Sequence, residues 1–157
     1  KELEVKDLGI VSKFLGMRVK FTNNGYTLDQ EVMIKDLIET NGMTKSKPTL
    51  SPISEQDEGG DDEALLNQAE IKAFRSLAGA LLWITRCTRP DIGFAVHKLT
   101  RRTHAPTVQD WKLAKRILRY LNGNSSMKLR NTLSSNEDLK FKAYSDADHA
   151  VNKIASL

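Results

Sequence analysis

The 157-residue chain has one cysteine, few aromatic residues and no long apolar run. Because Cys87 is its only cysteine, it cannot form an internal disulfide, which suits a reducing compartment. No apolar stretch approaches the roughly 18 residues of a membrane-spanning helix, so we expect no membrane partner. The charged start from Lys1 to Asp7 does not resemble a signal peptide. We therefore expect an intracellular protein of the cytoplasm or nucleus, or a secreted protein if a signal peptide has been removed.

Acidic residues are scarce from Glu70 to Arg130, where 13 lysines and arginines accompany only three acids. Residues 55–63, in contrast, hold six acids and no base. A basic body beside an acidic loop fits a nucleic-acid partner, and it also fits an ordinary solvated helical surface. A glycine-rich phosphate loop is missing too, because Gly59 and Gly60 lie among acids that would repel phosphate.

The apolar pattern predicts an α/β (α+β) fold with four parts. In the first part of the chain, residues 1–43, it predicts a β-hairpin followed by a helix. Residues 14–21 alternate as a strand, Asn23-Asn24-Gly25 is typical of a hairpin turn, and the chain returns as a second strand. Residues 31–41 have helical spacing. The next part, residues 44–68, is polar and contains prolines and glycines, which predicts a mobile acidic linker.

The third part, residues 69–123, predicts a basic unit of three helices. Leu82 belongs to the apolar stripe of the first helix, and Pro90 begins the second. Thr107 and Asp110 form a pattern typical of a capping box before the third. The last part, residues 124–157, predicts a short C-terminal β element with strands at 127–129 and 139–144.

Four cations recur at positions i, i+3, i+4 and i+7 of the third predicted helix: Lys112, Lys115, Arg116 and Arg119. This spacing places them in one stripe opposite the apolar side, where they could pair with phosphates along a duplex. The alternative is the ordinary polar face of an amphipathic helix, although such a face usually mixes signs and this one has no acid after Asp110. The stripe is therefore the candidate nucleic-acid-binding site.

Two carboxylates, Asp146 and Asp148, follow the strand predicted at 139–144 and would point the same way on an extended backbone. Such a pair can hold a hard divalent cation, although the spacing alone favours turn residues. Two-metal phosphoryl chemistry needs more than two carboxylates. We therefore expect no intact catalytic site and no cofactor, with Mg²⁺ bound only if a nuclease site were completed.

Several motifs together, in this order, resemble copia-type retrotransposon polyproteins. They are Lys6-Asp7-Leu8-Gly9, Phe14-Leu15-Gly16-Met17, Gly25-Tyr26-Thr27-Leu28-Asp29-Gln30, Phe74-Arg75-Ser76-Leu77-Ala78-Gly79, Thr88-Arg89-Pro90-Asp91-Ile92, the run from Ala114 to Leu121, and Tyr144-Ser145-Asp146-Ala147-Asp148. The resemblance covers residues 1–150. It implies the end of a reverse transcriptase followed by the first strand of a ribonuclease H domain.

The resemblance also implies roles for individual segments. Residues 14–30 would be the hairpin that grips the primer strand, and residues 31–42 would begin the thumb. The helices within residues 69–122 would be thumb and connection, tracking the template–primer duplex. Asp146 would be the first metal-binding carboxylate of ribonuclease H.

The chain departs from the family pattern in three ways. The polymerase Tyr-x-Asp-Asp motif is absent, and His149 stands where the family usually has Trp. The family sequence continues through a full nuclease domain, and residues 151–157 do not match that continuation. We therefore expect a truncated, non-catalytic remnant in which Asp146 is vestigial. Its partner would be a nucleic-acid duplex, either an RNA–DNA hybrid or DNA.

A second hypothesis is a co-opted protein-interaction module, such as a secreted effector acting on a host protein. An active nuclease or polymerase completed by another chain is disfavoured, because most of the required carboxylates are absent. The resemblance also implies that the rest of the ribonuclease H sheet is missing. Apolar surface that this sheet would cover would then stay exposed and favour self-association.

Overall fold

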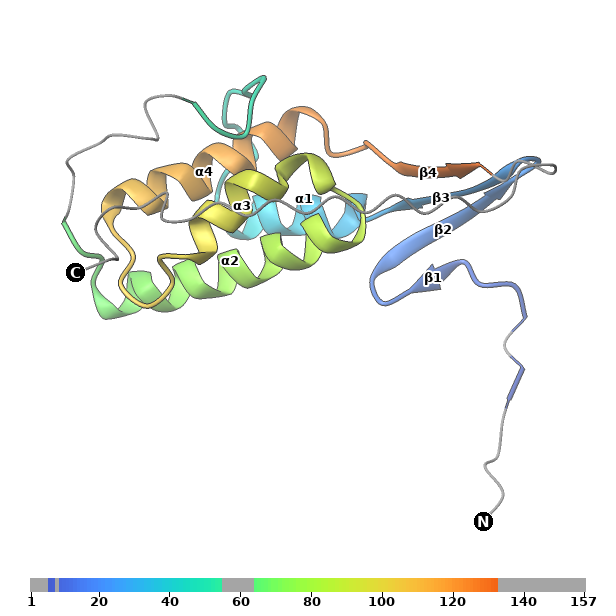
Figure 1. Ribbon diagram of the computed structural model, residues 1–157, viewed down its shortest axis with the longest axis horizontal. Helices are drawn as coiled ribbons and strands as arrows, with labels where there is room; N and C mark the ends of the chain where they lie inside the picture. The colour runs from blue at the N-terminus through green and yellow to red at the C-terminus, as the bar shows by residue number, and fades with distance from the viewer. Residues whose placement is uncertain (1–5, 8, 55–63, 133–157) are drawn as a thin grey trace, which may run out of the picture.

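The computed structural model describes residues 6, 7, 9–54 and 64–132, and in this part four α-helices accompany a four-stranded antiparallel sheet. The strands lie in the order β1 (Lys13–Phe14), β2 (Met17–Thr22), β3 (Gly25–Asp29) and β4 (Leu129–Thr132). The helices are α1 (Glu31–Thr40), α2 (Gln68–Cys87), α3 (Gly93–Thr100) and α4 (Val108–Gly123), with the 3-10 helix η2 (Pro90–Ile92) preceding α3. Figure 1 shows the sheet extending from one end of the helical unit. The mixed α/β class predicted from the sequence is confirmed.

Two tight turns shape the N-terminal strands. Asn23 and Asn24 join β2 to β3, with Thr22 opposite Gly25, so the predicted hairpin is confirmed. The prediction of one continuous strand from residue 14 to residue 21 is wrong. Leu15 (φ 49°) and Gly16 (φ 81°) form a second turn, between β1 and β2, and positive φ at both central residues is typical of a two-residue hairpin loop. Apolar alternation continues through this turn, which conceals it in the sequence.

The fourth strand pairs with the N-terminal hairpin. The strand predicted at 127–129 is displaced, since β4 begins at Leu129 and lies antiparallel to β3. The Asn131 amide donates to the Tyr26 hydroxyl at 2.8 Å, across 105 positions of sequence. The strand predicted at 139–144 lies outside the described residues. The C-terminal β element predicted over residues 124–157 is therefore described only as far as Thr132, and its ribonuclease H-like character stays a prediction.

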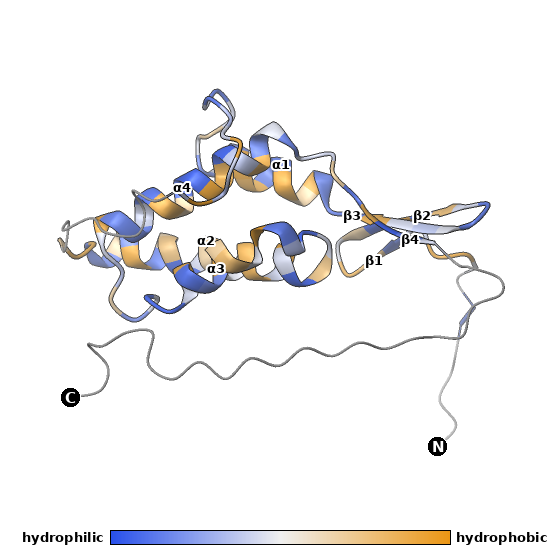
Figure 2. Ribbon diagram, turned by 45° about the horizontal axis from the view of Figure 1, so that its top comes forward, coloured by the Kyte–Doolittle hydropathy of each residue, from blue (hydrophilic) through white to orange (hydrophobic). Residues whose placement is uncertain are grey.

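All four α-helices contribute to one apolar core. Ile34 and Ile38 of α1 are buried together with Phe74 of α2, so the core spans the boundary predicted between residues 1–43 and 69–123. Figure 2 shows the apolar segments of the helices turned toward one another. Residues of η2 and α3 also belong to this core, and four of them are buried: Ile92, Ala95, Val96 and Leu99. None of the helices in the described part is long and apolar enough to cross a membrane.

One residue of the predicted apolar stripes points outward. Leu82 of α2 is 37% exposed, because the buried side of this helix is centred on Leu77, Leu81 and Ile84. Leu82 lies one residue beyond Leu81, and a step of 100° around the helix axis carries it to the edge of the buried face.

The predicted linker contacts the helices at several points of its described part. Leu66 belongs to the core, and the amide nitrogen of Leu66 donates to the Pro106 carbonyl oxygen at 3.1 Å. The Asn122 amide of α4 donates to the carbonyl oxygen of Thr44 at 3.3 Å. Residues 55–63, which hold its acidic run, lie outside the described residues, so the predicted mobility of that run stays a prediction.

Candidate nucleic-acid interface

The basic helix α4 begins at a complete capping box. The Asp110 amide donates to the Thr107 hydroxyl at 3.3 Å, and the Thr107 amide donates to the Asp110 carboxylate at 2.8 Å. The capping box predicted from the sequence is confirmed, and it satisfies two amides that no helical turn could pair. The buried side of α4 consists of Leu113, Ala114, Ile117, Leu118 and Leu121.

The four predicted cations lie along the side of α4 that faces away from this apolar stripe. Lys112 and Lys115 are exposed, whereas Arg116 and Arg119 are half-buried. The Lys115 ammonium lies 5.6 Å from the centre of the Trp111 ring, close enough for a cation–π contact. Lys112 and Arg116 also take part in interactions within the chain. The structure thus brings the four cations onto one surface, and their binding of nucleic acid stays a prediction.

A polar network centred on the buried Arg89 side chain holds the C-terminal end of α4. Arg89, which is 1% exposed, donates to both carboxylate oxygens of Asp91 at 2.9 and 2.7 Å. It also donates to the side-chain oxygen of Asn124 at 2.6 Å. The Tyr120 hydroxyl donates to Asp91 at 2.9 Å, and the Arg89 guanidinium lies 5.7 Å from the Tyr120 ring centre. The network therefore fixes where the basic helix ends relative to α2 and η2.

The charges of this network shift two pKa values. Burial by itself raises the pKa of Asp91, but the hydrogen bonds and charge of Arg89 outweigh it, so this pKa lies below its ordinary value. Burial and the hydrogen bond to Asp91 raise the pKa of Tyr120. Sequence reasoning missed the network, although Arg89 and Asp91 belong to a recognised motif. Their pairing with α4 depends on a tertiary contact.

The aromatic residues of the helices divide between core and surface. Trp111 packs against Phe74 with ring centres 6.1 Å apart, and both Trp111 and Tyr120 contact the core. Trp83 of α2 differs, because it is 38% exposed.

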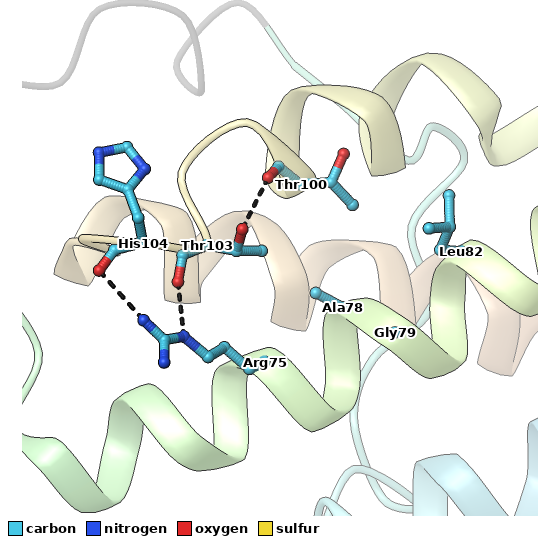
Figure 3. Close-up of a pocket in the computed structure, with 7 residues that line it drawn as sticks. All are labelled: Arg75, Ala78, Gly79, Leu82, Thr100, Thr103 and His104. Carbon is cyan, nitrogen blue, oxygen red and sulfur yellow. Dashed lines mark hydrogen bonds between the residues drawn. The ribbon is translucent and has the colours of Figure 1, made fainter.

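An open groove lies beside α2, where that helix meets the turn after α3 (Figure 3). The Arg75 guanidinium spans it and donates to the carbonyl oxygens of Thr103 at 2.7 Å and His104 at 3.2 Å. Ala78 and Gly79 line the groove on the α2 side. The guanidinium thus satisfies two carbonyl oxygens in the turn after α3, which is a structural role.

The candidate metal ligands Asp146 and Asp148 lie outside the described residues. Within residues 6, 7, 9–54 and 64–132, no three His, Cys, Asp or Glu side chains come together in a way that could hold a metal ion. Burial raises the pKa of Cys87, which disfavours its reactive thiolate form. The candidate site that the described residues present is therefore the cationic stripe of α4.

Comparison with known proteins relates the chain to transposons. It is 35% identical over 146 residues to the "Uncharacterized mitochondrial protein AtMg00810" of Arabidopsis thaliana, which covers 93% of this chain and 59% of that protein. It is 34% identical over 159 residues to the "Retrovirus-related Pol polyprotein from transposon RE1" of the same plant, which covers 98% of this chain and 10% of the polyprotein. The chain is a relative of copia-type retrotransposon Pol polyproteins.

This copia-type relationship confirms the resemblance predicted from the motifs, and it extends over nearly the whole chain. A third relative is the "Secreted RxLR effector protein 161" of Plasmopara viticola, 35% identical over 77 residues, which are 49% of this chain and 53% of that protein. The chain thus spans 59% of AtMg00810, about half of the effector and a tenth of the polyprotein. No protein-family model and no solved structure matches it.

Proposed function

We propose that this copia-type chain binds the backbone of a nucleic-acid duplex, either an RNA–DNA hybrid or DNA, and has no catalytic activity of its own. The observation that carries the proposal is the stripe of four cations on α4, a helix whose opposite side is buried in the core. No acid occurs between Asp110 and the end of the helix. The relationship to Pol polyproteins supports the same proposal of duplex binding. Under this proposal, α2 to α4 correspond to the thumb and connection, and the β1–β3 hairpins correspond to the primer grip.

Contacts of this kind recognise charge rather than sequence. Each neutralised phosphate of a duplex contributes a slope of about −0.9 to the dependence of log affinity on log salt concentration. Four contacts from the stripe would give a slope of about −3.6. We therefore expect similar affinities for duplexes of different sequence and a steep loss of binding as salt rises.

The test is a titration of the purified, nuclease-treated protein against a labelled RNA–DNA hybrid at two or more salt concentrations. The decisive variant is Lys112→Glu/Lys115→Glu, because both side chains are exposed and their reversal leaves the core intact. It should bind at least about tenfold more weakly and lower the steepness of the salt dependence by about 2. A matched control, Lys6→Glu/Lys72→Glu, makes the same charge change at exposed positions outside α4. Equal losses of affinity in the α4 variant and the control would show that only the net charge of the protein matters. Unchanged binding in the α4 variant would contradict the proposal.

The C-terminal part of the proposal concerns residues 124–157. We infer that they begin a ribonuclease H-like unit in which Asp146 is a vestigial carboxylate, with Asp148 the second candidate Mg²⁺ ligand. The protein should cleave no RNA–DNA hybrid when Mg²⁺ is added. Cleavage that disappears in Asp146→Asn would overturn the non-catalytic assignment.

A second candidate function is a protein-interaction module, and the likeness to a secreted RxLR effector favours it. On this reading the folded surface contacts a host protein instead of a duplex. A pull-down should then return one saturable protein partner, and nuclease treatment should not release it. Release of the partner by nuclease would show that nucleic acid bridges the two proteins, and would favour the proposal of nucleic-acid binding.

A further inference from the structure

One face of the four-stranded sheet is apolar. Directly paired residues of antiparallel strands lie on the same face, and the register pairs Phe21 of β2 with Tyr26 of β3. The rings of these two residues confirm the assignment, since their centres lie 6.4 Å apart. Within the described strands, no charged residue shares this side. The surface, which we call the apolar sheet face, consists of Phe14, Met17, Val19, Phe21, Tyr26, Leu28 and Leu129.

The helical core leaves the apolar sheet face uncovered. Among the described residues, no strand residue belongs to the core or to the partly buried side chains that pack against it. Phe14 and Phe21 are 57% and 55% exposed, and Leu129 is 41% exposed. Figure 1 shows the sheet projecting beyond the helices. Single exposed apolar side chains are common on protein surfaces, whereas a contiguous apolar patch marks a contact surface.

The exposed area of this face suits a weak contact between two copies of the chain. Phe14 and Phe21, each exposed by more than half, offer about 100 Å² apiece. Leu129, the half-buried residues of the face and the exposed Leu15 at its margin raise the total to roughly 450 Å². Two such faces would together bury roughly 900 Å², close to the roughly 1,000 Å² that a specific interface requires. This area favours a reversible equilibrium between monomer and dimer over an obligate dimer.

The distribution of charge selects the same face of a second copy as the partner. Arg18 lies opposite Asp29, and Arg130 lies opposite Thr27, so the cations of the strands share the other side of the sheet. Two copies that meet through their apolar faces therefore keep these cations on the outside, away from one another. Apolar sheet faces pack in this way in β-sandwiches, at a separation of about 10 Å with interdigitating side chains.

The polar groups of the apolar sheet face bond to each other. The Asn131 amide donates to the Tyr26 hydroxyl at 2.8 Å, and the register places Asn131 directly opposite Tyr26. A buried polar group is costly when it lacks a hydrogen-bond partner. Because this pair is already formed within one copy, a second sheet can cover it without leaving either side chain unpaired.

We propose that the chain forms a symmetric dimer in which the apolar sheet faces of two copies pack against each other. A two-fold axis makes such a contact isologous, so each phenylalanine of the face is used twice. The small buried area predicts a dissociation constant of roughly 10–100 µM. The dimer is independent of the proposed duplex binding, because the α4 stripe takes no part in it.

The test is sedimentation velocity of the purified, nuclease-treated protein over a series from about 1 µM to about 500 µM, which brackets the expected dissociation constant. The apparent mass should rise from 17.6 kDa toward twice that value. Burial of apolar area drives this association, so it should persist in about 0.5 M NaCl, where contacts between exposed charges are screened.

The decisive variant is Phe21→Glu, which places a carboxylate on the apolar sheet face. It should raise the dissociation constant of the dimer at least about tenfold, because the carboxylate would lose its hydration in the contact. Thr22→Glu is the matched control: Thr22 is the next residue of β2, is also exposed and lies on the other side of the sheet. It should leave the dissociation constant unchanged. Phe14→Gln/Phe21→Gln removes both rings without adding charge and should also weaken the dimer, and circular dichroism verifies that each variant is folded.

Three results would overturn the dimer or its location. A folded wild-type protein whose mass stays at 17.6 kDa through the whole series would overturn the dimer. If this monomer also bound the apolar dye ANS in a way that Phe21→Glu abolished, the partner of the face would be a different protein. A dimer that Phe21→Glu leaves unchanged, or that Thr22→Glu weakens equally, would overturn the assignment to the apolar sheet face.

Discussion

The helical unit and the sheet use their apolar residues in opposite ways. The helices bury their apolar stripes against one another, and Phe74, Leu81 and Ile117 are 0% exposed. In the four strands, the buried positions are Gly25, Thr27 and Asp29, while Phe21 is 55% exposed. Burial of apolar area is the main source of folding free energy. The comparison therefore assigns most of the folding free energy to the helices.

Truncating one aromatic ring in each region gives the largest expected difference. Phe74→Ala opens a cavity in the core and should lower the free energy of unfolding by about 3–5 kcal/mol. Phe21→Ala removes a ring that is more than half exposed and should cost less than about 1 kcal/mol. Urea denaturation of both variants measures the two values. Similar costs would show that the sheet is as important to stability as the helical core, and would break the comparison.

The two arginine networks provide a second contrast. Arg89 is 1% exposed, so Arg89→Met leaves Asp91 and Asn124 without their partner and should cost about 3 kcal/mol. The side chain of Arg18 in the sheet is 46% exposed, so Arg18→Met should lower the free energy of unfolding much less than Arg89→Met, despite similar bond lengths. Thermal unfolding at one pH compares them. A larger loss for Arg18 would mean that the sheet, and not the end of α4, contains the stabilising polar network.

The two regions also differ in how far the sequence predicts them. The helices were predictable because apolar residues repeat at helical spacing and their caps are local, as Thr107 and Asp110 show. The sheet was only partly predictable. Its first turn at Leu15–Gly16 does not interrupt the alternation, and the pairing of β3 with β4 joins segments about 100 residues apart.

The candidate site follows the same division. The α4 stripe can be identified from the spacing of Lys112 and its neighbours, because helix periodicity determines which residues share a side. The proximity of Lys20 and Arg130 in the sheet could not be predicted, since these two residues lie on either side of Thr27 of β3 only in the folded sheet. Local periodicity shows which side of a helix or strand a residue occupies. The order of strands in a sheet can be known only from the three-dimensional structure.

Glycine substitutions test the comparison at backbone level, and the larger effect is expected in the sheet. Gly25 has φ 143°, and a Cβ there would collide with the carbonyl oxygen of Asn131 on β4. Gly25→Ala should therefore cost about 1–3 kcal/mol locally and separate β4 from β3. Hydrogen exchange should accelerate at the β4 amides and stay unchanged in α2. Unchanged protection in β4 would contradict the tight approach of the two strands.

A glycine in a helix should respond in the opposite direction. Gly79 lies in the interior of α2, where a Cβ would meet no atom within 4 Å. Gly79→Ala should therefore raise the free energy of unfolding by about 0.5–1 kcal/mol, because alanine loses less backbone entropy in a helix. Gly123→Ala is the matched control at the end of α4, where a Cβ would lie 2.9 Å from the Cβ of Pro48. The control should gain nothing or lose stability in urea denaturation. A loss at Gly79 as well would show that the α2 backbone is strained at that position, and that the helical unit depends on its glycines as the sheet does.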